Sequence, residues 1–496
     1  MSSGPLAPEG QAGSEVWRPR VSPWLISASV MLATFMEVLD TTIVAVSLPH
    51  MAGNLSATTE EATWVLTSYL VANAIVLPAS GWLSLYSGRK RFLLACVTIF
   101  TTSSLLCGLA PSLPVLVFAR VLQGLGVGVA PIVGPTLGGW LTDSYTWRWI
   151  FYINIPIGIL ALFMMSRNVE DPPYIRNARP GRIDGIGFAF MILWLGTLQI
   201  ILDKGQQEDW FGAVWIRWFT GLSAAAMVLF VFTELRTRDP IVNLKILKNR
   251  NFGLGTSLMT LFGAALYSTV TLLPIFLQTL MGYPAVKSGI AISPRGLGSL
   301  VTLPLVGRLI GIVDARWMLV CGLSLFGASS FLFGSINLDV GMRNVVLPNL
   351  LQGLGMGLIF VPLATLTMGN LRNEQVGNAT SIFNLMRNLG GSFGISIATT
   401  FLARNAQSHQ ALMVSHLTPY DPAYQQRLAA IQNGLAPLTG APQAGQQAYA
   451  ALNGILVQQA ALRSFVDTFL WIALLIAFCV PWAFFMKKAV SRRAPA

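Results

Sequence analysis

Apolar runs of about twenty residues recur along almost the whole chain and are separated by short polar segments. Residues 92–111, for example, contain no charged side chain. A helix needs about 20 apolar residues to cross a hydrocarbon core about 30 Å thick, and backbone groups in lipid must be hydrogen-bonded within the protein. The pattern therefore predicts an all-α polytopic membrane protein with about 13 spans. The predicted spans are 23–49, 62–84, 91–111, 114–140, 147–166, 184–202, 214–233, 252–277, 288–310, 316–335, 345–368, 378–403 and 464–486.

Composition agrees with this class of protein. The chain has 496 residues, of which 54% are hydrophobic and 10% charged, whereas soluble domains carry about 25% charged residues. The four cysteines lie in apolar runs and the three histidines are scattered, so we expect no metal site. No phosphate-loop sequence is present. We therefore expect a protein that is not an enzyme, has no cofactor and, if it transports, draws on an ion gradient.

The net charge of +12 is concentrated in short loops, which is the positive-inside pattern of membrane proteins rather than a nucleic-acid signal. The basic segments 88–91 and 167–183 are predicted to be cytoplasmic, together with both termini, whereas the acidic segments 50–61 and 203–213 are predicted to lie outside. The signs alternate correctly except between the two basic segments named here. Three predicted spans separate them, although two loops on one side require an even number.

An internal repeat divides the chain into two related bundles. The sequence LQGLG occurs at 122–126 and 351–355, an offset of 351 − 122 = 229 residues, and similar interhelical loops begin at Gly81 and Gly307, an offset of 307 − 81 = 226. The glycines of this repeat are predicted to let neighbouring helices approach closely. We predict a disordered cytoplasmic tail at 1–22, a bundle at 23–166, a linker with two extra helices at 167–250, a six-helix bundle at 251–486 with an outer loop at 404–463, and a cytoplasmic tail at 487–496.

The first bundle is shorter than the second by about one span. LGG at 137–139 corresponds to LGG at 389–391, an offset of 389 − 137 = 252, which exceeds the offset of LQGLG by 252 − 229 = 23 residues. Together with the odd number of spans, this difference predicts an internal deletion near residues 123–130. The alternative is a single tilted or broken helix over 114–140.

Several sequence motifs resemble one known family. They comprise LDTTIVAVSLP at 39–49, WVLTSYL at 64–70, RVLQG at 120–124, APIVGPTLGG at 130–139 and WRWIFYINIPIG at 147–158. In this order they are similar to the motifs of the major facilitator superfamily, in its fourteen-span drug:H⁺ antiporter branch (the EmrB/QacA type). The resemblance implies the major facilitator fold, with two helical bundles and an extra helix pair.

The resemblance also implies roles for particular residues. Arg120 matches an arginine that the family links to proton coupling. The helix-five motif of the antiporters contributes Gly134, Pro135, Gly138 and Gly139, and the loop between the second and third helices contributes Gly88 and Arg89. That loop usually holds an acid–arginine pair in its middle, where this chain has Leu85 and Tyr86.

Two acids in the first span are candidates for proton exchange. Glu37 and Asp40 lie in the middle of an apolar run, where a carboxylate costs about 2.5–3.5 kcal/mol and is therefore usually functional. They are three residues apart and share one face of a helix. A structural ion pair with Arg120 is the alternative role.

Further polar and aromatic side chains are candidates for the substrate cavity between the bundles. Arg387 and Asn384 lie in the twelfth predicted span, and the two LQGLG copies contribute Gln123 and Gln352, while Trp64 is an aromatic candidate. A packing role is the alternative for each.

These features predict a proton-coupled multidrug efflux transporter of the inner (plasma) membrane that exports small amphipathic compounds by alternating access. Its expected partners are the lipid bilayer, its substrates and, as the resemblance implies, a periplasmic adaptor protein at the loop 404–463. One alternative is a transport-inactive deletion variant or a faulty gene model of such an exporter. Another is a membrane binding protein that uses the same scaffold without transport.

Overall fold

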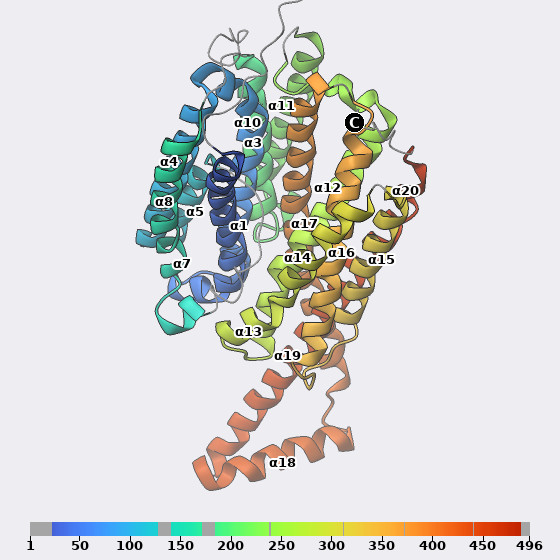
Figure 1. The fold of residues 1–496 in the computed structure, drawn as a ribbon. Coiled ribbons are helices and arrows are strands. Elements are labelled where there is room, and N and C mark those ends of the chain that lie inside the picture. Colours follow the sequence, from blue (N-terminus) through green and yellow to red (C-terminus); the bar gives the residue numbers. More distant parts are fainter. Residues whose placement is uncertain are drawn as a thin grey trace, which may run out of the picture.

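The structure is a computed structural model that describes residues 22–126, 140–170, 184–237, 240–310, 312–371, 373–439 and 441–487. These residues form helices and connecting loops and contain no strand, which confirms the predicted all-α class (Figure 1). Ten of their helical segments are long and apolar enough to cross a membrane.

The first bundle contains α1 (Pro23–Asn54), α2 (Thr59–Ala62), α3 (Trp64–Ser87), α4 (Arg89–Leu109), α5 (Leu113–Gly124), α7 (Trp149–Tyr152) and α8 (Asn154–Asn168). The extra pair consists of α10 (Gly185–Lys204) and α11 (Val214–Arg236). The second bundle contains α12 (Arg250–Ile275), α13 (Ala285–Ile292), α14 (Pro294–Leu309), α15 (Ala315–Phe333), α16 (Arg343–Met368), α17 (Asn373–His416), α18 (Pro422–Thr439), α19 (Ala441–Cys479) and α20 (Trp482–Phe485).

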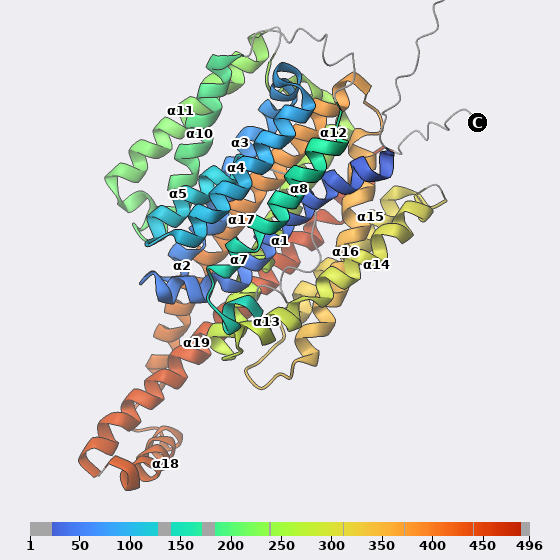
Figure 2. The same ribbon diagram turned by 60° about the vertical axis from the view of Figure 1, so that its left-hand side comes forward.

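Each bundle has its own apolar core, and the extra pair joins them along one edge. One buried cluster draws on α1, α3, α4, α5 and α8, and a larger one draws on α12, α13, α15, α16, α17 and α19. A third cluster combines α3 with α10, α11 and α17. The pair α10–α11 therefore packs against both bundles rather than standing apart in the membrane (Figure 2).

The glycines of the two LQGLG copies lie where helices touch. A Cβ added at Gly124 would meet the main-chain oxygen of Tyr69 at 2.6 Å, and one added at Gly353 would overlap the main-chain oxygen of Arg295. Both contacts join the fourth helix of a bundle, α5 or α16, to its second, α3 or α14. The predicted close approach of these helices is therefore present in both bundles.

The prediction of one span over 114–140 is wrong, because α5 ends at Gly124. Its 12 residues rise about 18 Å, which is less than the about 30 Å of a hydrocarbon core. At one end of the bundle Lys90 Nζ donates to the main-chain oxygen of Ser166 at 2.6 Å, and at the other Arg148 Nη2 donates to that of Ala110 at 2.8 Å.

Two full helices, α4 and α8, therefore connect these ends, and the chain lies at the end of Ala110 both where it leaves α4 and where it reaches Arg148. This arrangement places the basic segments that contain Lys90 and Arg167 at the same end, called here the basic end. It resolves the odd number of predicted spans without inverting any helix.

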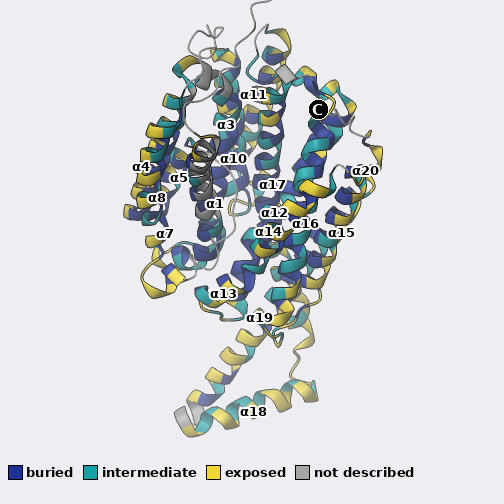
Figure 3. Ribbon diagram, in the orientation of Figure 1, coloured by how far each residue is buried: buried dark blue, intermediate teal, exposed yellow. Residues whose placement is uncertain are grey.

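The segment 404–463, expected to be a loop, is mostly helical. α17 continues to His416, α18 follows, and α19 begins at Ala441. These helices extend beyond the bundles on the side away from the basic end, and α18 is largely exposed (Figures 1 and 3). Runs rich in Ala and Gln favour helix, and pairing of the two long helices stabilises the extension, since Ser464 Oγ donates to the main-chain oxygen of Leu402 at 2.6 Å.

Candidate functional site

A completely buried ion pair lies in the centre of the first bundle. Arg120 on α5 donates from Nη1 to Oδ2 of Asp40 on α1, and neither side chain is exposed. Arg120 Nε also donates to the main-chain oxygen of Val65 at 2.9 Å, and the guanidinium lies 4.4 Å from the centre of the Tyr69 ring. A buried charge pair needs such additional contacts to offset the cost of removing both ions from water.

Neutral amides complete the shell around the Asp40 carboxylate. Its Oδ1 accepts hydrogen bonds of 3.0 Å from Nε2 of Gln123 and from Nδ2 of Asn154. Gln123 Oε1 accepts from Arg120 Nη1 at 2.8 Å, and Asn154 Nδ2 also donates to Ser104 Oγ at 3.0 Å. The network connects α1, α4, α5 and α8, so any change in the charge of Asp40 acts on most of the bundle at once.

The arrangement leaves one donor free. Arg120 Nη2 is buried and has no hydrogen-bond partner in the part of the chain that the structure describes. A buried donor without a partner carries a desolvation cost of about 1–3 kcal/mol. Asp40 accepts three hydrogen bonds of the network, but one buried donor of Arg120 has no acceptor among the described residues.

Some of the predicted site residues fall outside what the structure describes. Gly134, Pro135, Gly138 and Gly139 belong to the undescribed segment 127–139. Glu37 lies on α1 one turn before Asp40, and Arg89 begins α4, but their side chains are outside the described residues. Their roles stay predictions.

The backbone conformation at position 88 explains why a glycine stands there. Its φ of 85° lies in the left-handed region, which side chains rarely adopt and glycine adopts freely. Gly88 separates α3 from α4 and so allows the tight connection that places Lys90 at the basic end.

The candidates on α17 lie at the junction of the two bundles. Asn384 and Arg387 are half-buried, and Arg387 Nε donates to Asn388 Oδ1 at 3.4 Å. Asn388 Nδ2 in turn donates across the bundles to Oδ1 of Asn73 on α3 at 3.1 Å. These residues therefore form a contact distinct from the Asp40 network, whereas Gln352 is fully buried within the second bundle.

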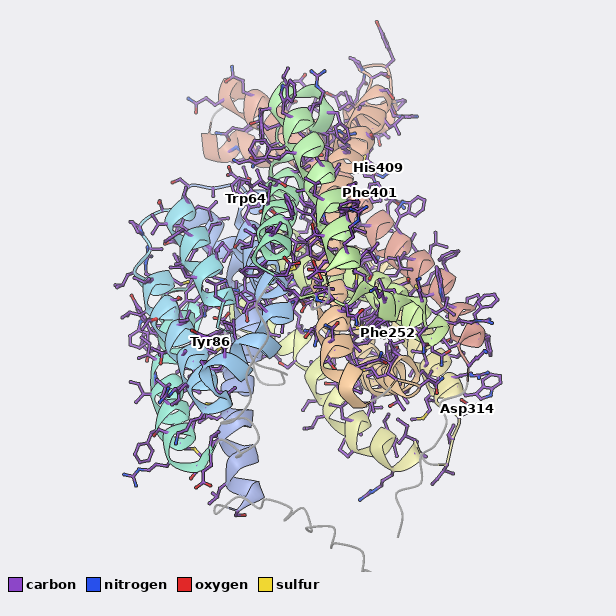
Figure 4. The ribbon with its side chains drawn as sticks, turned by 90° about the horizontal axis from the view of Figure 1, so that it is seen from above. Trp64, Tyr86, Phe252, Asp314, Phe401 and His409 are labelled. Atoms are coloured by element: carbon purple, nitrogen blue, oxygen red, sulfur yellow. The ribbon has the colours of Figure 1, made fainter. Side chains whose placement is uncertain are left out.

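Trp64 contacts the extra helix pair (Figure 4). Its Nε1 donates to the main-chain oxygen of Asp203 at 2.9 Å, and Lys204 Nζ lies 4.0 Å from its ring centre. Thr67 Oγ1 donates to Oδ1 of Asp203 at 2.9 Å. The indole therefore helps to attach α10 to α3, and its role as a substrate contact stays a prediction.

A second junction closes the bundles at the end away from the basic end. Both carboxylate oxygens of Asp143 accept main-chain hydrogens of α13, from Ala285 at 3.1 Å and from Val286 at 2.6 Å. Nearby on the same side, Gln278 Nε2 donates to the main-chain oxygen of Val46 at 2.6 Å. Three hydrogen bonds thus join the first bundle to the second there.

Sequence reasoning missed three members of the site, namely Tyr69, Ser104 and Asn154. Asn154 had a usable signal, because it is a strongly polar side chain inside the apolar run FYINIPIG. Tyr69 and Ser104 had none, since tyrosine and serine are common in membrane helices and only the packing brings them to Asp40.

The chain matches the family model of the Major Facilitator Superfamily over residues 30–131 and 125–395, two segments that overlap where α5 ends. It is similar to the fatty acid resistance protein FarB of Neisseria gonorrhoeae, with 32% identity over 93% of this chain and 96% of the relative. It is also 34% identical to the multidrug export protein EmrB of Haemophilus influenzae, over 81% of this chain and 84% of that protein.

Solved transporters share the fold. The POT family transporter PepTSo superimposes with a TM-score of 0.56 at 14% identity, covering 94% of this chain and 99% of that one. A bacterial homolog of the human lysosomal transporter Spinster, in an inward-facing and occupied conformation, gives 0.52 at 15% identity over 93% and 96%. The fold and the sequence matches agree with the resemblance seen in the motifs: this chain belongs to the Major Facilitator Superfamily, a family of membrane transporters.

Proposed function

We propose that this protein is a proton-coupled exporter of small amphipathic compounds in the inner (plasma) membrane, with both termini in the cytoplasm. The observation that carries the proposal is the buried pair of Asp40 and Arg120 with its amide shell. Relatives of similar length are named for multidrug export and for fatty acid resistance, which supports amphipathic substrates.

In this proposal, protonation of Asp40 controls how strongly Asp40 and Arg120 attract each other. A proton on Asp40 removes its negative charge, so Arg120 loses its counter-ion and the bonds from Gln123 and Asn154 lose their charge assistance. α1 and α5 can then separate or slide. When Asp40 releases the proton on the other side of the membrane, the pair forms again and restores the first arrangement.

Alternating access requires the two ends of the molecule to open in turn. The junction made by Asp143 and Gln278 closes one end, and it must break for substrate to leave there. Because the basic end is the proposed cytoplasmic side, the structure corresponds in this scheme to the state that is closed to the outside.

A second candidate function is that of a transport-inactive variant, and the length of α5 favours it. Twelve residues do not cross the membrane, and the family match restarts within 125–131. If about one span is missing from the first bundle, Arg120 keeps its partner but the bundle lacks part of its wall. Resequencing the gene across codons 118–142 tests this directly, because a recovered coding segment would show that the short α5 is an artefact.

The helical extension α17–α19 is the proposed site for a periplasmic adaptor protein. It projects beyond the bundles on the proposed outer side (Figure 2), and His409 Nε2 lies 2.6 Å from Asp467 Oδ2 at its base. The resemblance to the drug:H⁺ antiporter branch, which implies such an adaptor, supports this assignment. Co-purification with and without residues 418–440 would test it.

The transport experiment adds a fluorescent amphipathic dye to the medium around inverted membrane vesicles whose interior is acidified, so that export appears as dye uptake into the vesicles. The proposal expects dye accumulation that stops when the gradient is dissipated and that is lost in Asp40→Asn. Absence of gradient-dependent accumulation in the unmodified protein would refute transport and favour the inactive variant.

A further inference from the structure

A buried cation in the second bundle has no acidic partner among the residues that the structure describes. Arg295 lies on α14 and is 7% exposed, and its Nε and Nη2 have no hydrogen-bond partner within the described residues. No ion pair of the described chain includes it. An ionised side chain inside the membrane is costly and normally has a partner or a function.

Arg295 occupies the place in the second bundle that Tyr69 has in the first. Gly353 packs on the main-chain oxygen of Arg295 just as Gly124 packs on that of Tyr69. The offset of the LQGLG repeat is 353 − 124 = 229, so Asn349 and Gln352 correspond to Arg120 and Gln123. The second bundle therefore has a counterpart of the Asp40 network, with a cation brought in from α14 instead of α16.

The counterpart lacks the anion. In the first bundle Asp40 accepts a hydrogen bond from both Arg120 and Gln123, whereas α12 to α16 contain no aspartate or glutamate. Instead, buried polar groups without partners lie on α13, α14 and α16. Both amide atoms of Gln352 lack partners within the described residues, as do Oδ1 of Asn349 and Oγ of Ser288. Asn349 is anchored to this region, since its Nδ2 donates to the main-chain oxygen of Ala291 at 3.2 Å.

The depth of Arg295 matches the middle of the membrane. Ala285 begins α13 at the junction with Asp143, and Arg295 follows 295 − 285 = 10 residues later. Ten helical residues rise about 15 Å, which is half of a hydrocarbon core about 30 Å thick. Transporter substrates are typically bound at this depth, between the bundles.

We propose that Arg295, assisted by the amide of Gln352, binds the carboxylate of an amphipathic anion that this protein exports. Arginine presents a planar set of donors that fits a carboxylate, and the apolar side chains of the surrounding bundle accept the hydrocarbon part. The inference rests on the proposed export function, which it refines by naming a substrate class and a residue that selects it.

The test is equilibrium binding of radiolabelled decanoate to the full chain in phosphatidylcholine nanodiscs, without a proton gradient. The unmodified protein is expected to bind it saturably, and Arg295→Gln to weaken binding at least about tenfold. Arg295→Lys keeps the charge and should retain part of the affinity. Arg308→Gln is the matched control, because Arg308 lies on the same helix but is exposed at its far end, and it should bind as the unmodified protein does.

A second variant guards against a folding defect. Gln352→Leu removes the amide without removing a charge, and it should weaken decanoate binding several-fold while the thermal unfolding temperature stays at or above that of the unmodified protein. Decanoate should raise that temperature in the unmodified protein but not in Arg295→Gln. Equal binding by the unmodified protein and Arg295→Gln, or no saturable binding at all, would overturn the proposal.

Two further experiments distinguish an inorganic anion from an amphipathic one, and the proposed binding site from the proposed transport function. If chloride in large excess abolishes decanoate binding, the site holds inorganic anions and the assignment to an amphipathic substrate fails. In vesicles, Arg295→Gln should lower gradient-driven export of decanoate but not of an amphipathic cationic dye. Loss of all export in the unmodified protein, with Arg295-dependent binding kept, would refute the proposed function and leave this site standing.

Discussion

Asp40 and Arg120 form an ion pair in which both side chains are fully buried, although 80 residues separate them in the chain. The pair connects the first helix of the bundle to the short helix α5. Gln123, one turn after Arg120, contacts both partners. Most of the expected behaviour of this protein follows from how these three side chains depend on one another.

The first prediction concerns proton coupling. Asp40→Asn keeps the shape and most hydrogen bonds of the side chain but cannot take up and release a proton. We expect gradient-driven dye export to fall by at least about tenfold with little change in protein level. Export that persists in Asp40→Asn would contradict a coupling role for this residue.

The second prediction concerns stability. Asp40→Leu leaves Arg120 buried without its counter-ion, which should lower the free energy of unfolding by about 3–5 kcal/mol. The double variant Asp40→Leu/Arg120→Met removes both charges and should recover most of that loss, because apolar side chains of similar size replace a buried pair well. Thermal unfolding in detergent measures both, and a double variant no more stable than Asp40→Leu would argue against the pair as the cause.

The third prediction tests close helix packing. A methyl group at Gly124 would meet the main-chain oxygen of Tyr69 at 2.6 Å, so Gly124→Ala must push α5 away from α3. We expect a loss of about 1–3 kcal/mol, measured by the unfolding temperature. Gly53→Ala is the control, since nothing lies within 4 Å of the added methyl group, and it should be neutral or slightly stabilising.

The fourth prediction tests the path of the chain around α5. In a variant without the native cysteines, single cysteines at Ser87 and Asn168 should react with an impermeant maleimide from the same side of the membrane, because Lys90 and Ser166 are hydrogen-bonded. A cysteine at Tyr145 should react from the opposite side. Labelling of the first two from different sides would mean that α5 and the following segment cross the membrane an odd number of times.

The fifth prediction concerns the junction that Asp143 makes with α13. Asp143→Ala removes the acceptor for two main-chain hydrogens at 3.1 and 2.6 Å, a loss of about 1 kcal/mol for a helix cap. A cysteine placed at Val46, which is buried beside this junction, should then be labelled faster from the outside.

The control for this experiment is Asp314→Ala. Asp314 caps α15 by accepting from the main chain of Arg316 at 3.1 Å but does not connect the bundles. It should therefore leave the labelling rate at Val46 unchanged, and equal acceleration by both variants would show a general loosening instead of a gate.

The sequence by itself determined the fold class and nearly every membrane helix. Apolar runs have to become helices in lipid, so the predicted spans 91–111 and 316–335 reappear as α4 and α15 with shifts of one to two residues. It also singled out Asp40, Arg120 and Gln123, because polar residues in an apolar run are rare and costly.

Only the tertiary structure decided which of these residues meet and that α5 ends at Gly124. That Arg120 reaches Asp40 while Arg295 reaches no acid in the described part of the chain depends on side chains from different helices, and spacing along the chain does not contain that information. Similarly, the apolar pattern over 114–140 favours one long helix. The contacts of Lys90 and Arg148 are incompatible with a single crossing there, because they place Ser166 beside Lys90 and Arg148 beside Ala110. Local hydrophobicity determines that a segment enters the membrane, whereas packing against neighbouring helices determines where its helix ends.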